Sequence, residues 1–302
     1  MNGFLNVIKP PAMSSAAVVG FVKRLTKEKC GHAGTLDPEA CGVLPVMVGR
    51  ATRLLDHFTD RSKEYVALLS FTGATDTQDA QGALIAPGKR IPEREEVQRA
   101  SQRFVGDILQ RPPAYSAIKQ NGVPLYALAR AGKDAVAKER PARVDAIDLL
   151  DQLPDGDYRI RVRCGEGTYI RTLCHDIGQA LDCPAHMKLL IRSRSGAFAM
   201  RSGVTLEELQ AAAVHERLSQ MLLPLDYPLS GLRRIDLTGS LLKKALNGVR
   251  LPLGCLPIRI GEEACIYGDG ELIGIALGEE DMIRFPVLLT SAVEYCARHP
   301  AR

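Results

Sequence analysis

Between residues 31 and 45 the chain reads Gly31-His32-Ala33-Gly34-Thr35-Leu36-Asp37-Pro38-Glu39-Ala40-Cys41-Gly42-Val43-Leu44-Pro45. We call residues 31–45 the signature stretch. Gly31 and Gly34 permit backbone conformations and close approaches that a side chain would forbid, and Pro38 biases the residue before it toward an extended conformation. Glycine and Asp-Pro segments also mark ordinary surface turns. The stretch is therefore either a solvated turn or a loop that holds Asp37 as a reactive carboxylate in a defined, non-helical geometry.

Further motifs lie around the signature stretch in a fixed order. They are Asn6-Val7-Ile8-Lys9-Pro10-Pro11 with Met13-Ser14-Ser15, Val46-Met47-Val48-Gly49-Arg50-Ala51-Thr52-Arg53-Leu54, Lys63-Glu64-Tyr65-Val66, Asp76-Thr77-Gln78-Asp79-Ala80-Gln81-Gly82, Arg111-Pro112-Pro113-Ala114-Tyr115-Ser116-Ala117-Ile118-Lys119, Leu125-Tyr126, Ala129-Arg130-Ala131-Gly132 and Gly167-Thr168-Tyr169-Ile170-Arg171-Thr172-Leu173. Together they resemble the TruB-type tRNA pseudouridine synthases. Two positions depart from the family pattern. Pro11-Ala12 stands where a glycine is common, and Ile191 replaces the first of two arginines, which leaves Arg192 and Arg194 as the basic pair.

The resemblance implies roles for individual residues. It implies that Asp37 is the catalytic carboxylate, that Arg171 pairs with it, and that Tyr65 stacks on the target base and could act as general base. It also implies a substrate-binding set in which His32 packs against the RNA loop and transfers no proton; the set is Lys9, Gly31, His32, Tyr169 and Leu190. Whether Asp37 adds to the base or assists a glycal route stays open.

The implied activity is isomerisation of the T-loop uridine at position 55 of tRNA to pseudouridine, with the target base flipped into the site. The implied partner is the tRNA T stem-loop, and a monomer is expected. Two alternatives are a guide-RNA-dependent synthase of the H/ACA type and a non-catalytic tRNA-folding protein. The lack of long basic tails and the retained insert at residues 90–106 disfavour the first. The joint presence of Asp37, Tyr65 and Arg171 disfavours the second.

Composition permits nucleic-acid binding without requiring it. The 302 residues include 39 Lys and Arg against 35 Asp and Glu, which gives a net charge of +4. The sequence pI is about 8.6. Eight cysteines form no C-x-x-C pair and follow no secretory signal, so reduced thiols in a cytoplasmic protein are expected. No apolar run approaches the ~18 residues of a membrane span.

The sequence predicts neither a metal nor a nucleotide cofactor. Cys174-His175, Cys183 and His186 have a spacing that fits no common zinc site. Neither G-x-G-x-x-G after a strand nor G-x-x-x-x-G-K-[ST] occurs. Conversion of uridine to pseudouridine involves no redox change and needs no cofactor.

The hydrophobic pattern predicts a mixed α/β chain rich in strands. The resemblance implies an α/β (α+β) catalytic domain of the pseudouridine-synthase type, with a mixed, mainly antiparallel sheet and with helices and loops around a central cleft. The predicted elements are a helix capped by Ser14 or Ser15, a strand at Lys63–Phe71, a helix at Arg94–Val105, a strand at Tyr158–Cys164 with a basic face, a helix capped by Thr168, and a helix with a Thr205–Glu208 capping box. The basic face is either solvated or a phosphate-contacting surface.

A domain boundary is expected near Pro228 to Arg234, which gives domains 1–231 and 232–302. In residues 232–302 the sequence predicts a short helix at Leu241–Asn247, a hairpin around Gly268-Asp269-Gly270 and a final strand at Ile283–Leu289. A small β-barrel is the simplest interpretation. The order of these elements resembles the PUA-like RNA-binding module of the same family, and a purely structural β-domain is the alternative.

Overall fold

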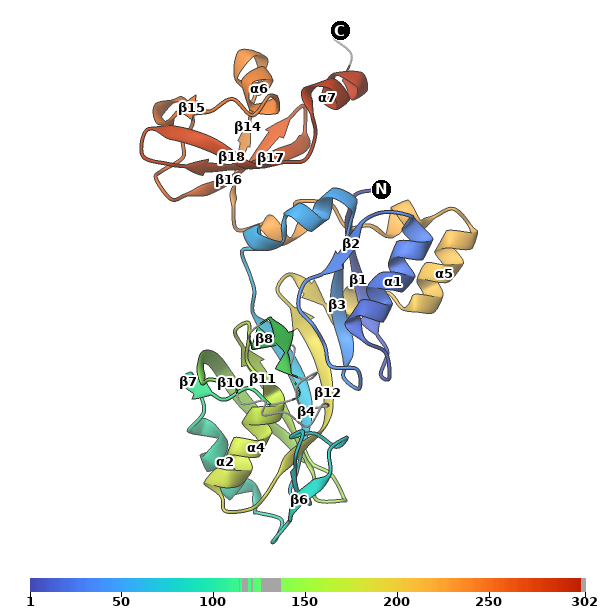
Figure 1. Cartoon of the computed structure of the whole chain (residues 1–302), viewed down its shortest axis with the longest axis vertical. Helices are drawn as coiled ribbons and strands as arrows, with labels where there is room; N and C mark the ends of the chain where they lie inside the picture. Colours follow the sequence, from blue (N-terminus) through green and yellow to red (C-terminus); the bar gives the residue numbers. More distant parts are fainter. Residues whose placement is uncertain (114, 116–118, 121, 126–136, 300–302) are drawn as a thin grey trace.

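The computed structural model describes residues 1–113, 115, 119–120, 122–125 and 137–299 (Figure 1). Of the predicted motifs, residues 114 and 116–118 of the motif at 111–119, residue 126 of the next and the whole of the motif at 129–132 lie outside the described residues.

The larger sheet has nine strands and is antiparallel except for one pair. Its order is β1 (Gly3–Lys9), β3 (Cys41–Val48), β12 (His186–Ser195), β4 (Lys63–Ser70), β11 (Tyr158–Cys164), β10 (Arg140–Gln152) and β7 (Gly106–Gln110), with β2 (Cys30–His32) paired to β3 and β13 (Phe198–Ala199) paired to β12. The parallel pair joins β3 to β12, so residues far apart in the sequence lie side by side next to the centre of the sheet. The mixed, mainly antiparallel sheet predicted from the sequence is confirmed.

Strands β4 and β11 form the centre of the sheet, and their side chains alternate as predicted. In β4, Tyr65, Ala67 and Leu69 are buried, and in β11 every second residue from Tyr158 to Cys164 is buried. The exposed arginines of β11 face acids on β10: Arg159 pairs with Asp151, at 2.8 Å from its Nε to Oδ1. This pairing balances part of the charge on the basic face and favours the solvated alternative.

Helices cover the two ends of the sheet (Figure 1). They are α1 (Ser15–Thr26) and α5 (Leu206–Val214) beside β1 and β2, and α2 (Arg94–Gln102) and α4 (Ile170–Ala180) beside β10 and β12. Ser14 caps α1 by accepting from the Ala17 amide at 3.1 Å, and the Thr205–Glu208 capping box is present, as predicted. Helix α2 ends three residues before the predicted Val105.

The predicted cap of α4 is wrong. Tyr169 occupies the N-cap position, and the Thr168 hydroxyl donates to the carbonyl of Arg143 at 3.2 Å. A strand carbonyl close in space therefore competes successfully with the amides of the helix for this hydroxyl.

Short elements complete the first 231 residues. They are η1 (Gly49–Arg53), η2 (Leu55–His57), β5 (Gly73–Thr75), β6 (Leu84–Pro87), β8 (Lys119–Gln120), β9 (Val123–Pro124), η3 (Met200–Ser202), η4 (Leu218–Met221) and η5 (Tyr227–Leu229). Among the helices of the described residues, none has both the length and the apolar character that a membrane crossing requires.

The C-terminal segment forms a second sheet, a half-barrel with two helices against it. Its elements are β14 (Arg233–Asp236), α6 (Gly239–Leu246), β15 (Leu251–Pro252), η6 (Leu253–Cys255), β16 (Glu263–Gly268), β17 (Glu271–Gly278), β18 (Met282–Leu288) and α7 (Ala292–Arg298). The strand order is β14-β16-β17-β18-β15. Asp269 and Gly270 both have positive φ, 46° and 82°, which is the two-residue hairpin geometry that an Asp-Gly pair favours.

The second sheet packs on the segment that directly follows β3. One hydrophobic cluster contains Phe4, Val43 and Leu54 of the first sheet region together with Cys265 and Tyr267 of the second. Polar contacts surround it. Arg53 donates to the Leu288 carbonyl at 2.8 Å, and the His57 ring contacts Glu263 at 2.9 Å. The two sheets therefore share buried apolar side chains, although each also has a core of its own.

Candidate active site

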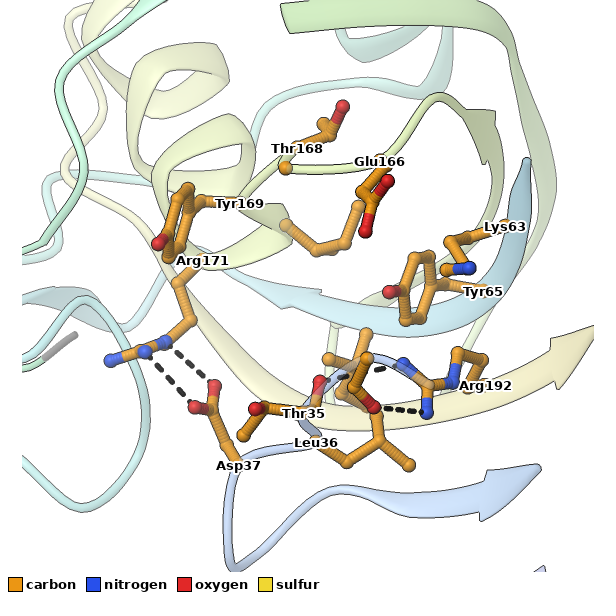
Figure 2. Close-up of a pocket in the computed structure, with 14 residues that line it drawn as sticks. Thr35, Leu36, Asp37, Lys63, Tyr65, Glu166, Thr168, Tyr169, Arg171 and Arg192 are labelled. Carbon is orange, nitrogen blue, oxygen red and sulfur yellow. Dashed lines mark hydrogen bonds and ion pairs between the residues drawn. The ribbon is translucent and has the colours of Figure 1, made fainter. Parts of the chain in front are cut away.

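A cavity of about 440 Å³ opens between the signature stretch and the middle of the large sheet (Figure 2). Residues from four places in the sequence line it: Gly34, Thr35, Leu36, Asp37, Lys63, Tyr65, Glu166, Gly167, Thr168, Tyr169, Ile170, Arg171, Leu190 and Arg192. Strands β4 and β12 supply the floor, and the turn that enters α4 supplies one wall. The sheet order explains this assembly, because β12 lies between β3 and β4.

Asp37 and Arg171 form a two-point ion pair at one side of this cavity (Figure 2). The Nε of Arg171 lies 3.0 Å from Oδ2 of Asp37, and its Nη2 donates to Oδ1 at 3.1 Å. The Arg171 side chain is only 5% exposed, whereas that of Asp37 is 38% exposed. The buried guanidinium of Arg171 therefore holds the carboxylate on one side, and the other side of the carboxylate stays open to the cavity.

Arg171 also holds the neighbouring loops. It donates to the carbonyls of Tyr115 at 3.1 Å and Thr77 at 3.4 Å, and its Nη1 lies 3.6 Å from Oδ2 of Asp79. Asp37, Asp79 and Tyr115 lie in three different sequence motifs, and Arg171 lies in a fourth, so four motifs meet at this guanidinium.

The pKa of Asp37 lies above that of an ordinary aspartate. Burial raises the pKa, Arg171 lowers it, Asp79 raises it again and Lys9 lowers it. The raised pKa keeps Asp37 closer to protonation than a surface carboxylate, and Arg171 is the largest influence that opposes this.

Three further side chains fix the loop that carries Asp37. Lys9 is fully buried, and its Nζ donates to the carbonyls of Pro38 at 2.8 Å, Pro10 at 2.8 Å and Met13 at 2.6 Å. The Ser15 hydroxyl donates to the Leu36 carbonyl at 3.0 Å and accepts from its amide at 2.9 Å. Lys9 therefore lies outside the cavity lining and holds the residue next to Asp37.

Arg192, the third of these side chains, is 1% exposed and binds the other side of the loop. Its Nε donates to the Val43 carbonyl at 2.7 Å. Its Nη2 donates to the Gly34 carbonyl at 3.0 Å, and its Nη1 donates to the Thr35 carbonyl at 3.4 Å. We did not predict it as a site residue. The signal that could have found it is the strand register, which pairs Arg192 with Tyr65.

The structure explains the glycines of the signature stretch by different physical reasons. Gly34 has φ of +96° and Gly42 has φ of +105°, and a Cβ at Gly42 would lie 2.3 Å from the Arg192 carbonyl oxygen. Gly31, in contrast, has no left-handed φ, and a Cβ there would meet Met47 at an ordinary 3.4 Å. Close approach thus explains Gly42, and backbone conformation explains Gly34.

The predicted aromatic and apolar residues line the cavity. Tyr65, Tyr169 and Leu190 all contribute to its wall or floor. Tyr65 is 8% exposed, and burial raises the pKa of its phenol. Its ring therefore presents a neutral, flat surface to the cavity.

His32 and Gly31 lie on β2, paired with β3, and neither lines the cavity. Burial lowers the pKa of His32, and its Nδ1 is buried without a hydrogen-bond partner among the described residues. Arg194 of the predicted basic pair contacts Asp60 at 3.0 Å at the surface. Within the described ranges, no group of three or more His, Cys, Asp or Glu side chains is arranged to hold a metal.

Comparison with known proteins gives consistent matches along the chain. The family model described as "TruB family pseudouridylate synthase (N terminal domain)" matches residues 23–170, and "tRNA pseudouridylate synthase B C-terminal domain" matches residues 171–230. A "tRNA pseudouridine synthase B" of Alkaliphilus oremlandii is 38% identical over 282 residues, covering 92% of this chain and 93% of the relative. The protein of the same name from Syntrophomonas wolfei is 43% identical, covering 82% and 84%.

Solved structures are similar over nearly the whole chain. "Crystal Structure of a Cbf5-Nop10-Gar1 Complex" matches with a TM-score of 0.73 and 26% identity, covering 97% of this chain and 86% of that chain. "Structure of H/ACA RNP bound to a substrate RNA containing 2'-deoxyuridine" matches with a TM-score of 0.71 and 25% identity, covering 95% and 85%.

Proposed function

The chain belongs to the TruB family of pseudouridylate synthases, isomerases that make pseudouridine in tRNA, and we propose that its target is the T-loop uridine at position 55. The reaction breaks the bond between ribose C1′ and uracil N1, turns the base and joins C1′ to C5. The C5 proton is lost and N1 gains one, so the product is an isomer of the substrate. We assign Asp37, Tyr65 and Arg171 to this chemistry.

The observation that carries the assignment is the two-point Asp37–Arg171 pair beside a cavity floored by Tyr65. A carboxylate that is buried on one side and open on the other can act on the sugar or the base as a nucleophile, or stabilise positive charge at C1′. Arg171 keeps Asp37 ionised and oriented against the desolvation that raises its pKa.

The cavity suits a uracil base that is flipped out of its stack in the RNA. Extrusion of a nucleotide loses stacking energy, and an aromatic face with apolar neighbours replaces part of it. We propose that the uracil lies against Tyr65, with Leu190 and Tyr169 around it. Because burial raises the pKa of Tyr65, its phenol is protonated in the free protein. We therefore assign Tyr65 stacking as its main role, and a general-base role only with the substrate bound.

The guide-RNA-dependent alternative is not favoured. The relatives that are 36–44% identical over most of the chain are named as tRNA enzymes, whereas the H/ACA structures share 25–26% identity. We propose domains 1–231 and 232–302, with the second as an RNA-binding module of the PUA type. We further propose that the protein acts as a monomer on the tRNA T stem-loop, and in the cytoplasm because tRNA is its substrate.

The test is incubation of the purified protein alone with an unmodified tRNA transcript, followed by mapping of pseudouridine. We expect one product site, at position 55, with no added RNA. A transcript with cytidine at that position is the matched control and should stay unmodified. Absence of product, a product at another position or a requirement for a guide RNA would each overturn a separate part of the proposal.

A further inference from the structure

Lys63 is a buried cation in the cavity that the chemistry above does not use. It begins β4, two residues before Tyr65, and only 9% of it is exposed. Its side chain lines the same cavity as Asp37. Among the described residues its ammonium makes neither a hydrogen bond nor an ion pair, although lysines this deeply buried are nearly always paired.

The charges around Lys63 do not neutralise it. Its pKa is lowered to about 8 by burial and by Arg192 of β12, while Glu166, Asp60 and Cys164 act in the opposite direction. Both carboxylates are engaged elsewhere: Glu166 pairs with Arg61 at 3.2 Å and Asp60 with Arg194 at 3.0 Å. Burial raises the pKa of the Cys164 thiol, on the neighbouring strand β11, to about 12, so that group is neutral.

Lys63 lies on the side of the cavity away from the catalytic pair. Figure 2 shows it beside Tyr65, with Asp37 and Arg171 across the cavity. The signature stretch approaches it at Gly34, where a Cβ would lie 3.7 Å from Lys63 Cε and 3.6 Å from Nη1 of Arg192. A nucleotide that placed its sugar near Asp37 and its base on Tyr65 would therefore extend toward this ammonium.

We propose that Lys63 is a further substrate-binding residue, whose ammonium donates a hydrogen bond to an acceptor oxygen of the target nucleotide, either a uracil carbonyl or a phosphate oxygen. The proposal rests on the proposed function. The other cations of the lining are already occupied: Arg192 donates to carbonyls of the signature stretch, and Arg171 contacts Asp37. Of the cavity-lining cations in the described part of the chain, Lys63 alone keeps all its donors for a ligand.

The experiment compares Lys63→Met and Lys63→Arg with the wild type in tRNA binding and single-turnover rate. Lys89→Met, at a surface lysine whose ammonium contacts Asp182 at 2.7 Å, is the control for loss of one positive charge. We expect Lys63→Met to weaken tRNA affinity by about 10- to 100-fold, the range for a hydrogen bond to a charged group. The control should bind within about twofold of the wild type.

The pH dependence separates binding from a structural role. Wild-type affinity should fall as the pH rises through about 8, because the ammonium then loses its proton. Lys63→Met should lose this alkaline decline and bind weakly at every pH. Lys63→Arg, whose guanidinium does not deprotonate in this range, should retain part of the affinity and also lose the decline.

The salt dependence separates the two acceptors. A lost phosphate contact reduces the slope of log affinity against log salt by about one, whereas a lost carbonyl contact leaves the slope unchanged. Lys63→Met that folds and matches the wild type in affinity, rate and pH profile would overturn the proposal. If Lys63→Met does not fold, a wild-type alkaline decline in Lys63→Arg would overturn it. Failure of the wild type to make pseudouridine would instead overturn the proposed function.

Discussion

The hydroxyl of Ser15 both donates to the carbonyl of Leu36 and accepts from its amide, at 3.0 and 2.9 Å. One side chain at the start of α1 thus satisfies both backbone groups of the residue before Asp37. Ser15 is 2% exposed and Leu36 is 3% exposed, so water cannot replace either bond without movement of the loop.

Ser15→Ala should therefore affect both stability and catalysis. Two buried backbone groups would lose their partner, which lowers the free energy of unfolding by about 1–3 kcal/mol. The displaced loop should lower the single-turnover rate by about 10- to 100-fold while tRNA affinity is retained. Ser14→Ala, which removes only the cap of α1, should cost about 1 kcal/mol and leave the rate unchanged. Equal rates for the two variants would contradict this role for Ser15.

Asp37→Asn should abolish turnover without loss of the fold or of tRNA binding. The amide has the shape of the carboxylate but cannot serve as an anion, so the rate should fall by about 10⁴-fold or more. Pseudouridine formation in the tRNA is the measurement, with filter binding to confirm that the tRNA still binds. Glu39→Gln, at the exposed carboxylate two residues away, is the matched control and should be fully active. Substantial product from a verified Asp37→Asn protein would refute the catalytic assignment.

Arg171→Ala should change the pH dependence of the rate as well as its size. Burial already raises the pKa of Asp37, and loss of the guanidinium raises it further because the main opposing influence disappears. Activity requires the ionised form, so the variant should recover partly as the pH rises. Arg171→Lys should lose about 100-fold, because an ammonium cannot hold both carboxylate oxygens. Single-turnover rates against pH test both variants. A large loss with a flat profile would indicate positioning alone.

Ala12→Gly should stabilise the protein. Ala12 has φ of +59°, a left-handed conformation that costs a residue with a Cβ about 1 kcal/mol. We expect the free energy of unfolding to rise by about 0.5–1 kcal/mol in chemical denaturation. Ala16→Gly, on the exposed side of α1, should instead lower it by a similar amount. Destabilisation by both substitutions would contradict the strain at Ala12.

Asp176→Asn should flatten the dependence of stability on pH. Burial raises the pKa of Asp176 to about 6, from 3.8 for an exposed carboxyl. Between these values the folded chain binds this proton more strongly than the unfolded chain does, so wild-type stability falls as the pH rises through this window. The variant should be more stable at pH 7 by about 1–3 kcal/mol and show less decline. Asp182→Asn, at a 91% exposed side chain, should follow the wild type in urea titrations at each pH.

The sequence motifs predicted three residues of the candidate site. The other contributions depend on how strands far apart in the sequence pair in the sheet. Asp37, Tyr65 and Arg171 lie in recognisable segments, so their convergence on one cavity could be anticipated. The alternation of buried and more exposed side chains in β4 and β11 could also be predicted, because each strand packs one face on the core. The contributions of Arg192 and Lys63 depend on the register of β12 beside β4, and on which donors other residues have already occupied. The sequence of a single strand contains neither kind of information.

The same dependence misled the prediction at Thr168. Its local sequence has the pattern of a helix cap, but its hydroxyl reaches the Arg143 carbonyl 25 residues earlier in the chain. A local sequence pattern predicts the hydrogen-bond partner of a side chain only where the fold places no competing group from a distant segment beside it.

The insertion of β12 between β3 and β4 also determines when the site can form during synthesis. The Asp37 loop is held by Arg192, and the contact between Arg192 and Val43 spans 149 residues. Contacts this distant in sequence form late, because a long segment must be ordered before they contribute. A nascent chain that still lacks residues 186–195 has the signature stretch but no strand to close the gap beside it. In such a chain Lys9 and Ser15 are present but Arg192 is missing, so one side of the Asp37 loop has no support. The complete site therefore forms only after about two thirds of translation.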